Sequence, residues 1–350
     1  MNATTAERPF RVTVPPTGDA AKPASAKGPR FLRTLIRATV STVALIAVVA
    51  AVGATYETIA GASDTATYPA AGRLVDVGGY RMHLDCRGMG SPTVVMDAGL
   101  GGSSLDWILV QEDLTRTARV CTYDRAGMGR SEVSPRPRTP EHIADELHLL
   151  LTNAGLSGPY VLVAHSLAGK TVRMFASAHP DEVAGMVLVD TRSELVDAQI
   201  PKAEAEAFDV ALRLQGVLYS VARRFGVARA FGSDLAGVPR LSPATATEMV
   251  LLMTQADAID ETTREGQARA ADDATLAKAT LGAMPLLVIA SAVSMAEIPN
   301  WPMAQRRLAA LSTQGTLVIA EHAGHAVQLE DPGIVIDGVE QVLARVRSEL

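Results

Sequence analysis

The sequence is poor in cysteine and in aromatic residues. It has two cysteines in 350 residues, and phenylalanine, tryptophan and tyrosine together make up 4% of the chain. With so few aromatic residues and abundant alanine, the core is expected to be mainly aliphatic. Apolar residues still account for 48% of the chain, which is enough for a sizeable core. The length of 350 residues fits one large domain with an insertion, or two ordinary domains. No internal repeat is visible.

Positive charge is outnumbered by negative charge outside the N-terminal segment. Residues 1–37 carry seven cations and two anions, a net charge of +5, so the rest of the chain carries −11 of the total of −6. An acidic globular part argues against nucleic acid as a partner. Residues 1–29 are rich in proline, alanine, threonine and charge. Because they show almost no apolar periodicity, residues 1–37 are expected to form a basic, disordered segment.

Charge is absent from the 19 residues Ala38–Tyr56. As a helix rising about 1.5 Å per residue, this run spans roughly 28 Å, close to the hydrocarbon thickness of a bilayer. Arg30, Arg33 and Arg37 precede it, and acidic residues follow it. By the positive-inside rule the N-terminus then stays in the cytoplasm and the remainder lies outside. The run predicts a single-pass anchor in the cell membrane, followed by a linker of small and polar residues at 57–71.

A cleaved signal peptide, with secretion of the domain, is the alternative. The charged leader of such a peptide is usually short and its apolar core is about 7–15 residues long. Here 37 residues precede a longer run, which favours an uncleaved anchor, although the small residues at 60–63 leave cleavage open. A buried helix of the soluble domain is disfavoured because the run has no polar face.

From residue 72 onward, short apolar runs alternate with helical patterns. The predicted strands are Leu74–Val77, Tyr80–Cys86, Thr93–Met96, Arg119–Tyr123, Tyr160–Ala164, Met186–Val189, Pro285–Ala290 and Thr316–Ala320. The predicted helices are Thr139–Ala154, Leu167–His179, a segment near Trp301–Leu311 and a last one from Pro332. Strands separated by helices imply an α/β fold with a mostly parallel sheet and helices on both of its faces.

The alternation stops between residues 191 and 283. This region is rich in alanine, helical in character and without a clear strand. Roughly ninety residues between two strands are too many for a loop. We therefore expect a helical cap at 191–283 on a single domain that spans 72–350.

Ser166 follows one of the fully apolar strand patterns and precedes a predicted helix. A serine on a sharp strand-to-helix turn exposes its hydroxyl at the carboxyl edge of the sheet, and the residues two before and two after it must be small. Both positions usually hold glycine, and here they are Ala164 and Ala168. By itself the motif fits equally well a helix N-cap serine after a buried strand.

Two more residues follow Ser166 in the order serine, acid, histidine that this arrangement requires. His325 comes after the last predicted strand, and the glycine before it lets the loop turn the imidazole toward the serine. Asp190 ends the strand after the nucleophile helix and is favoured as the acid, although it also fits an N-cap of the first cap helix. Glu297 is the alternative acid, because a carboxylate after the strand that follows the cap is the commoner location.

The backbone N–H groups of Leu100 and Leu167 are the expected donors to an oxyanion. One follows the nucleophile, and the other belongs to a glycine-rich loop after a strand. That loop lacks the Lys-Ser/Thr ending of a phosphate cradle. His322 and His325 are spaced as two metal ligands can be, but no third ligand of metal type clusters nearby. We therefore expect neither a metal nor an organic cofactor.

Four segments are similar to a known family: YDRAGMGRS at 123–131, GPYVLVAHSLAGK at 158–170, GMVLVD at 185–190 and AGH at 323–325. They resemble the α/β-hydrolase superfamily, and most closely its lipase, esterase and haloperoxidase-like branch with a helical lid. The resemblance covers about residues 72–350. It implies hydrolysis of an ester-like bond by Ser166, Asp190 and His325. Lys170 departs from the pattern, and we expect it to be solvated or paired.

The leading hypothesis is a serine hydrolase that cleaves a carboxylic ester of a small apolar or amphipathic molecule through an acyl-enzyme. Because residue 166 is not an aspartate, dehalogenase and epoxide hydrolase activities are disfavoured. An amide or peptide hydrolase, similar to aminopeptidases, is one alternative. A catalytically silent ligand-binding protein is another, which the intact Ser166 and His325 disfavour. The pattern leaves the oligomeric state open.

Cys86 and Cys121 lie on two predicted strands that the usual order of this fold makes neighbours. Export would place both in an oxidising space, where pairing is allowed. A disulfide is one hypothesis, and a pair of buried, small apolar residues is the other.

Overall fold

The computed structural model describes residue 13 and residues 28–349. Apart from residue 13, the predicted disorder of residues 1–27 lies outside the described residues. The chain divides into two compact units, Met1–Val49 and Ala50–Leu350.

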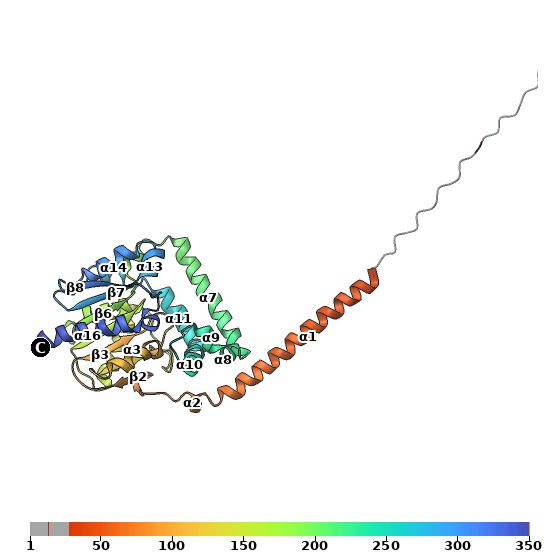
Figure 1. The fold of residues 1–350 in the computed structure, drawn as a ribbon, viewed down its shortest axis with the longest axis horizontal. Helices are drawn as coiled ribbons and strands as arrows, with labels where there is room; N and C mark the ends of the chain where they lie inside the picture. Colours follow the sequence, from red (N-terminus) through yellow and green to blue (C-terminus); the bar gives the residue numbers. More distant parts are fainter. Residues whose placement is uncertain (1–12, 14–27, 350) are drawn as a thin grey trace, which may run out of the picture. The chain divides into compact units, whose positions relative to one another are not determined.

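A sheet of eight strands forms the centre of the second unit (Figure 1). The strands are β1 (Arg73–Asp76), β2 (Arg81–Arg87), β3 (Thr93–Asp97), β4 (Val120–Tyr123), β5 (Tyr160–His165), β6 (Val183–Val189), β7 (Leu286–Ser291) and β8 (Gly315–Ala320). Their order in the sheet is β1-β2-β4-β3-β5-β6-β7-β8. The pairs β1–β2 and β2–β4 are antiparallel and all the others are parallel. The predicted mostly parallel sheet is therefore confirmed.

Helices cover both faces of the sheet, because their apolar stripes need a partner. The helices α4 (Pro140–Asn153), α5 (Ala168–Ala178) and α14 (Trp301–Ala309) pack on one face. The helices α3 (Ile108–Leu114) and α16 (Pro332–Glu349) pack on the other. The sequence patterns predicted all of these except α3. It follows a short 3-10 turn at Ser104–Trp107, which Ser103 and Asp106 stabilise with a capping box.

The region between β6 and β7 forms the helical cap. Its helices are α6 (Glu194–Asp197), α7 (Lys202–Arg224), α8 (Val227–Ala230), α9 (Gly232–Ala236), α10 (Pro243–Met253), α11 (Ala256–Ala268) and α12 (Asp273–Leu276). They follow the carboxyl end of β6, so the cap begins at the sheet edge where the side chains of Ser166 and Asp190 are presented.

The N-terminal helix α1 (Gly28–Gly61) is longer than the apolar run 38–56 in both directions. The prediction of disorder up to residue 37 is wrong for 28–37, because apolar residues and helix-favouring arginines there continue the helix. Within the predicted linker 57–71, residues 57–61 end α1 and Asp64–Thr67 forms α2. By length and composition, α1 is able to cross a membrane.

A disulfide links Cys86 of β2 to Cys121 of β4. The two residues are paired directly across the antiparallel strands. The bond lies within the sheet, at the second residue of β4.

Candidate active site

Ser166 occupies the turn between β5 and α5. Its φ is +54°, in the left-handed region that a non-glycine residue adopts at a cost. Its N–H donates to the carbonyl oxygen of Val189, 3.2 Å away, which ties the turn to the neighbouring strand. Ala164 and Ala168, the residues two before and two after, are both buried. Their small side chains fit where larger ones would crowd the turn.

His325 lies between Ser166 and Asp190. Its Nε2 is 2.8 Å from the Ser166 Oγ, and its Nδ1 is 2.7 Å from the Asp190 Oδ2. The imidazole is half exposed, whereas the carboxylate is fully buried. The structure therefore brings together three residues that are up to 159 positions apart in the chain.

Asp190 is held by a set of donors that the sequence did not reveal. Besides His325, its oxygens accept hydrogen bonds from the Ser291 N–H at 3.0 Å, the Ser294 hydroxyl at 2.5 Å and the Trp301 indole N–H at 2.8 Å. Four donors leave the carboxylate little freedom to turn, so it fixes the orientation of the imidazole. Glu297, the alternative acid, is exposed at the end of α13 (Ala292–Glu297) and is not among the partners that the structure gives His325.

The glycine-rich loop after β3 packs directly against Ser166. A Cβ on Gly99 would lie 2.7 Å from the His165 ring and 3.1 Å from the Ser166 Cβ, so only glycine fits there. The N–H groups of Leu100 and Leu167 both belong to the segments that meet here. Within the described residues, neither has a protein acceptor. Both are thus available to a developing oxyanion.

Arg125 holds this loop in place through the loop's carbonyl oxygens, and it is not among the residues predicted from the sequence. Its guanidinium donates to the carbonyl oxygens of Ala98 and Gly99, the latter at 2.7 Å. It also pairs with Asp97 at 2.7 Å and with Glu265 of the cap at 2.9 Å. The only sequence signal was its place inside the segment YDRAGMGRS at 123–131.

Burial governs the charges around Arg125. It raises the pKa of Asp97, and the adjacent guanidinium offsets this only in part. Burial acts in the same direction on Glu265, but Arg125 and Arg138 together hold its pKa below the usual value. Glu265 therefore stays ionised and links the cap to the loop.

His165 precedes Ser166 in the chain and contacts His325. Its Nε2 lies 2.8 Å from the carbonyl oxygen of His325, so this nitrogen carries the proton and donates. Burial, and then the neighbouring His325, lower the pKa of His165 to about 3. His165 is therefore a neutral residue that positions His325.

Lys170 is fully buried, so the expectation of a solvated side chain is wrong and that of a paired one is confirmed. It forms ion pairs with Asp197 of the cap helix α6 and Asp273 of α12. Its ammonium group also donates to the carbonyl oxygen of Arg269 at 2.7 Å. Lys170 therefore joins α5 to the cap.

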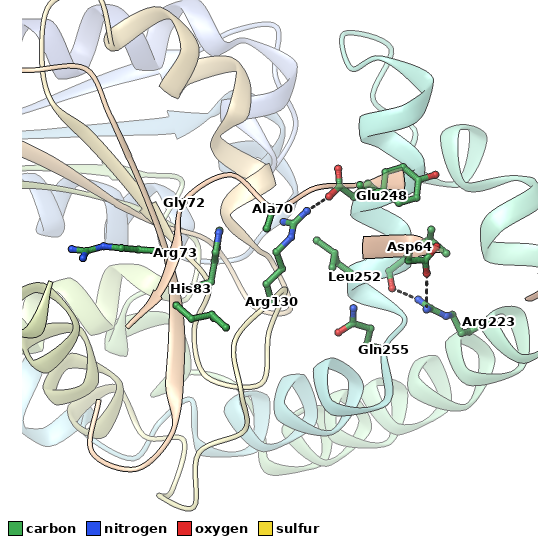
Figure 2. Close-up of a pocket in the computed structure, with 13 residues that line it drawn as sticks. Asp64, Ala70, Gly72, Arg73, His83, Arg130, Arg223, Glu248, Leu252 and Gln255 are labelled. Carbon is green, nitrogen blue, oxygen red and sulfur yellow. Dashed lines mark hydrogen bonds and ion pairs between the residues drawn. The ribbon is translucent and has the colours of Figure 1, made fainter. Parts of the chain in front are cut away.

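An apolar cavity opens beside the loop that carries Leu100. It has a volume of about 160 Å³, and its lining residues are Leu100, Gly101, Phe208, Leu212, Gln215, Gly216, Tyr219, Met253, Ile259, Thr262 and Thr263. Its walls come from the glycine-rich loop after β3 and from the cap. A larger cavity of about 530 Å³ lies between residues 64–74 and the cap (Figure 2). Ser166, Asp190 and His325 do not line it, and four of its charged side chains form two ion pairs, Arg130 with Glu248 and Arg223 with Asp64.

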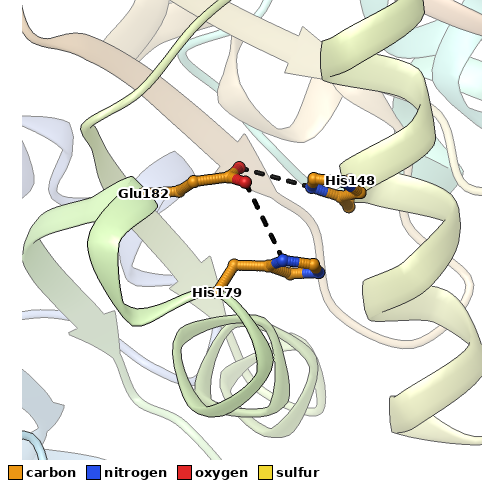
Figure 3. A group of neighbouring side chains, drawn as sticks. All are labelled: His148, His179 and Glu182. Atoms are coloured by element: carbon orange, nitrogen blue, oxygen red, sulfur yellow. Dashed lines mark hydrogen bonds and ion pairs between the residues drawn. The ribbon is translucent and has the colours of Figure 1, made fainter.

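A cluster of two histidines and a glutamate lies at the C-terminal end of α5, the end away from Ser166. His148 of α4 and His179 at the end of α5 both face Glu182, with the His148 Nδ1 3.3 Å from a carboxylate oxygen (Figure 3). The two rings are stacked with an angle of 6° and centroids 3.9 Å apart. A cation binds a histidine nitrogen close to the plane of its ring, and these two nearly parallel planes meet only far from the ring nitrogens. As they are arranged, the three residues form a packing contact between helices.

A family model described as the alpha/beta hydrolase fold matches residues 92–332. An uncharacterized protein of Schizosaccharomyces pombe is 31% identical over 226 residues, which cover 64% of this chain and 41% of that protein. An "AB hydrolase superfamily protein" of Gibberella zeae is 34% identical over 107 residues, which cover 29% and 33%. The chain thus spans less than half the length of either relative.

A solved structure of an esterase from Thermogutta terrifontis superposes with a TM-score of 0.59. The two sequences are 22% identical, and the match covers 79% of this chain and 99% of the esterase. At that identity the likeness concerns the fold.

Proposed function

The chain belongs to the α/β-hydrolase fold family, and on that premise we propose that it is a serine hydrolase that cleaves carboxylic esters through an acyl-enzyme. One observation carries the proposal. The imidazole of His325 lies within hydrogen-bond distance of both the Ser166 hydroxyl and the Asp190 carboxylate. A hydroxyl, an imidazole base and a buried carboxylate, hydrogen-bonded in that order, form the arrangement that activates a serine nucleophile.

In the first step, the Ser166 Oγ attacks the ester carbonyl carbon while the His325 Nε2 takes the hydroxyl proton. The carbonyl oxygen becomes an oxyanion, which the N–H groups of Leu100 and Leu167 stabilise. The alcohol leaves with the proton that His325 returns to it, and the acyl group stays on Ser166. In the second step His325 activates a water, which releases the acid and restores the serine. Asp190 stabilises the transient imidazolium.

We propose a small apolar or amphipathic molecule as the substrate. The apolar cavity beside Leu100 supports this, because Phe208, Leu212 and Ile259 surround it with hydrocarbon. Its volume of about 160 Å³ suits a short acyl group.

A fluorophosphonate probe tests the nucleophile. We expect the full chain to be labelled, Ser166→Ala to lose the label, and Ser193→Ala to keep it as the matched control. A series of p-nitrophenyl esters of increasing acyl length then tests the ester chemistry. Labelling of Ser166 without turnover of any ester, but with turnover of anilides, would favour the amidase alternative. Absence of any labelling would refute the proposal.

We also propose that α1 anchors the chain in the cell membrane, with the N-terminus in the cytoplasm and the hydrolase domain outside. The uncharged run 38–56 and the arginines at 30, 33 and 37 support this orientation. Extraction of membranes with alkaline carbonate tests it. An anchored chain stays in the membrane pellet, and external protease digests the hydrolase domain of intact cells. Release of a shortened chain into the medium would instead mean cleavage and secretion.

A further inference from the structure

The long cap helix α7 carries an apolar stripe on the side that faces away from the protein. Its inner face is buried, with Gly216 so close to α11 that a Cβ would lie 2.7 Å from a methyl carbon of Ile259. On the outer face five apolar residues follow one another at helical spacing, with exposed fractions of 49–68%. They are Val210, Leu214, Val217, Leu218 and Val221. These five residues are called the α7 stripe below.

Single exposed apolar residues are ordinary, but a continuous stripe of them marks a surface that contacts something apolar. The exposure also continues past the end of α7. Phe225, Val227 and Phe231 are 39%, 40% and 56% exposed. Exposed Arg213 and Arg224 lie on α7 beside the stripe.

The C-terminal end of α7 is fixed to the last turns of α1. Gly53 of α1 has no room for a Cβ, because it would overlap the backbone of Phe225. Arg229 bridges Glu57 at 3.0 Å and Asp64 at 2.6 Å. Arg223 pairs with the same two carboxylates, at 2.8 Å and 3.7 Å, and Figure 2 shows its link to Asp64. The C-terminal end of the α7 stripe therefore lies where the apolar run of α1 ends.

We propose that the α7 stripe is a membrane-binding surface, which lies in the outer interface of the bilayer that α1 spans. The inference rests on the anchor proposed above. If residues 38–56 cross the bilayer, Gly53 lies near its outer boundary, and the backbone contact with Phe225 brings the end of α7 to the same level. A helix with one apolar face and arginines beside it is suited to that boundary, where the apolar side chains enter the acyl region and the cations meet lipid phosphates.

The surface would also give the enzyme access to lipid-dissolved substrate. Phe208, Leu212 and Tyr219 on the other faces of α7 line the apolar cavity next to Leu100. One helix thus separates the bilayer from the cavity. The substrate class that fits is an amphipathic ester that partitions into membranes.

Spin labels on the full chain in vesicles of phosphatidylcholine and phosphatidylglycerol test the proposal. Both native cysteines are in the disulfide, so an introduced cysteine is the only free thiol. Leu218→Cys reports the stripe, Val43→Cys reports the anchor, and Met89→Cys, at a position 80% exposed, is the control in water. We expect the Leu218→Cys label to be relaxed by oxygen and protected from a water-soluble nickel complex, as the Val43→Cys label is, and the Met89→Cys label to behave in the opposite way.

Two results would overturn the proposal. If nickel reaches the Leu218→Cys label as freely as the Met89→Cys label, the stripe lies in water, and the Val43→Cys label shows whether the anchor itself survives. If Leu218→Cys labels on two copies give a short dipolar distance in detergent as well as in vesicles, a second copy of the chain covers the stripe.

Hydrolysis provides a second readout. The double variant Leu214→Ser with Leu218→Ser should hydrolyse p-nitrophenyl acetate in solution at the normal rate, and should lose about tenfold or more of its rate on an ester held in vesicles. Val133→Ser with Leu149→Ser, two exposed apolar positions outside the cap, is the matched control and should lose neither activity. An unchanged rate on the vesicle-held ester would overturn the proposal. If the proposed esterase activity is wrong, neither ester is hydrolysed. The spin labels still show whether the α7 stripe lies in the membrane.

Discussion

The ring of His165 donates a hydrogen bond from Nε2 to the backbone carbonyl oxygen of His325, 2.8 Å away. His165, the residue before Ser166, therefore positions the loop that carries His325. The two rings are close, with centroids 4.7 Å apart. Burial favours the neutral form of His165.

Acid is expected to destabilise the fold through His165. Its pKa of about 3 in the folded protein lies far below the ordinary histidine value of about 6.5. Below pH 6.5 the unfolded chain takes up a proton that the folded chain refuses until about pH 3, so the free energy of unfolding falls across this window. In His165→Gln the amide nitrogen replaces the Nε2 donor, and the free energy of unfolding should fall less over this pH range.

Chemical denaturation of the full chain at about pH 7.5 and pH 5 measures this difference. The same substitution at exposed His322 is the control and should leave the slope unchanged. An identical slope for wild type and His165→Gln would mean that His165 does not carry the acid sensitivity.

Asp190→Asn is expected to lower kcat by about 10³–10⁴-fold, with a small effect on KM. The Asn amide cannot accept from His325 as the carboxylate does, so the imidazole loses its orientation and its countercharge. Initial rates on a p-nitrophenyl ester measure the loss. Glu297→Gln is the matched control and should retain full activity, and a large loss in that variant would make Glu297 the acid after all.

Arg125→Lys is expected to weaken both catalysis and stability. A lysine ammonium cannot span Asp97, Glu265 and the two loop carbonyls that the guanidinium reaches. We expect kcat to fall by about 10²-fold because the Leu100 N–H loses its fixed place, and the free energy of unfolding to fall by about 3 kcal/mol. Ester kinetics and urea titration measure the two effects. Arg116→Lys, an exposed arginine that pairs only locally, should change neither.

Reduction of the Cys86–Cys121 bond should lower stability without changing the active site. The bond closes a loop of 35 residues. Its constraint on the unfolded chain should add about 4 kcal/mol to the free energy of unfolding. Thermal unfolding with and without a reductant measures the difference. A variant with alanine at both positions should unfold at the same temperature in both conditions. No response of the wild type to reductant, with two thiols found by mass, would show that the bond is absent.

The sequence alone determined the sheet and the order of its parts. Apolar runs of strand length, separated by helices of amphipathic period, specify a parallel sheet, and the order of Ser166, Asp190 and His325 along the chain matches the order in which that sheet presents its carboxyl ends. The α3 helix escaped prediction because it is short and begins with a 3-10 turn. The start of α1 was placed too late because a drop in hydropathy at the arginines does not end a helix.

Tertiary structure decided what surrounds these residues. Which carboxylate meets His325 depended on the backbone N–H of Ser291 and the side chains of Ser294 and Trp301, which come from successive elements after the cap. The burial of Lys170 and the role of Arg125 depended on acids that the cap supplies. Neighbours along a chain are fixed by covalent bonds and local hydrogen bonding, so their pattern can be read from the sequence. Partners a hundred residues apart are chosen by packing and by the cost of burying charge, which become definite only when the chain is folded.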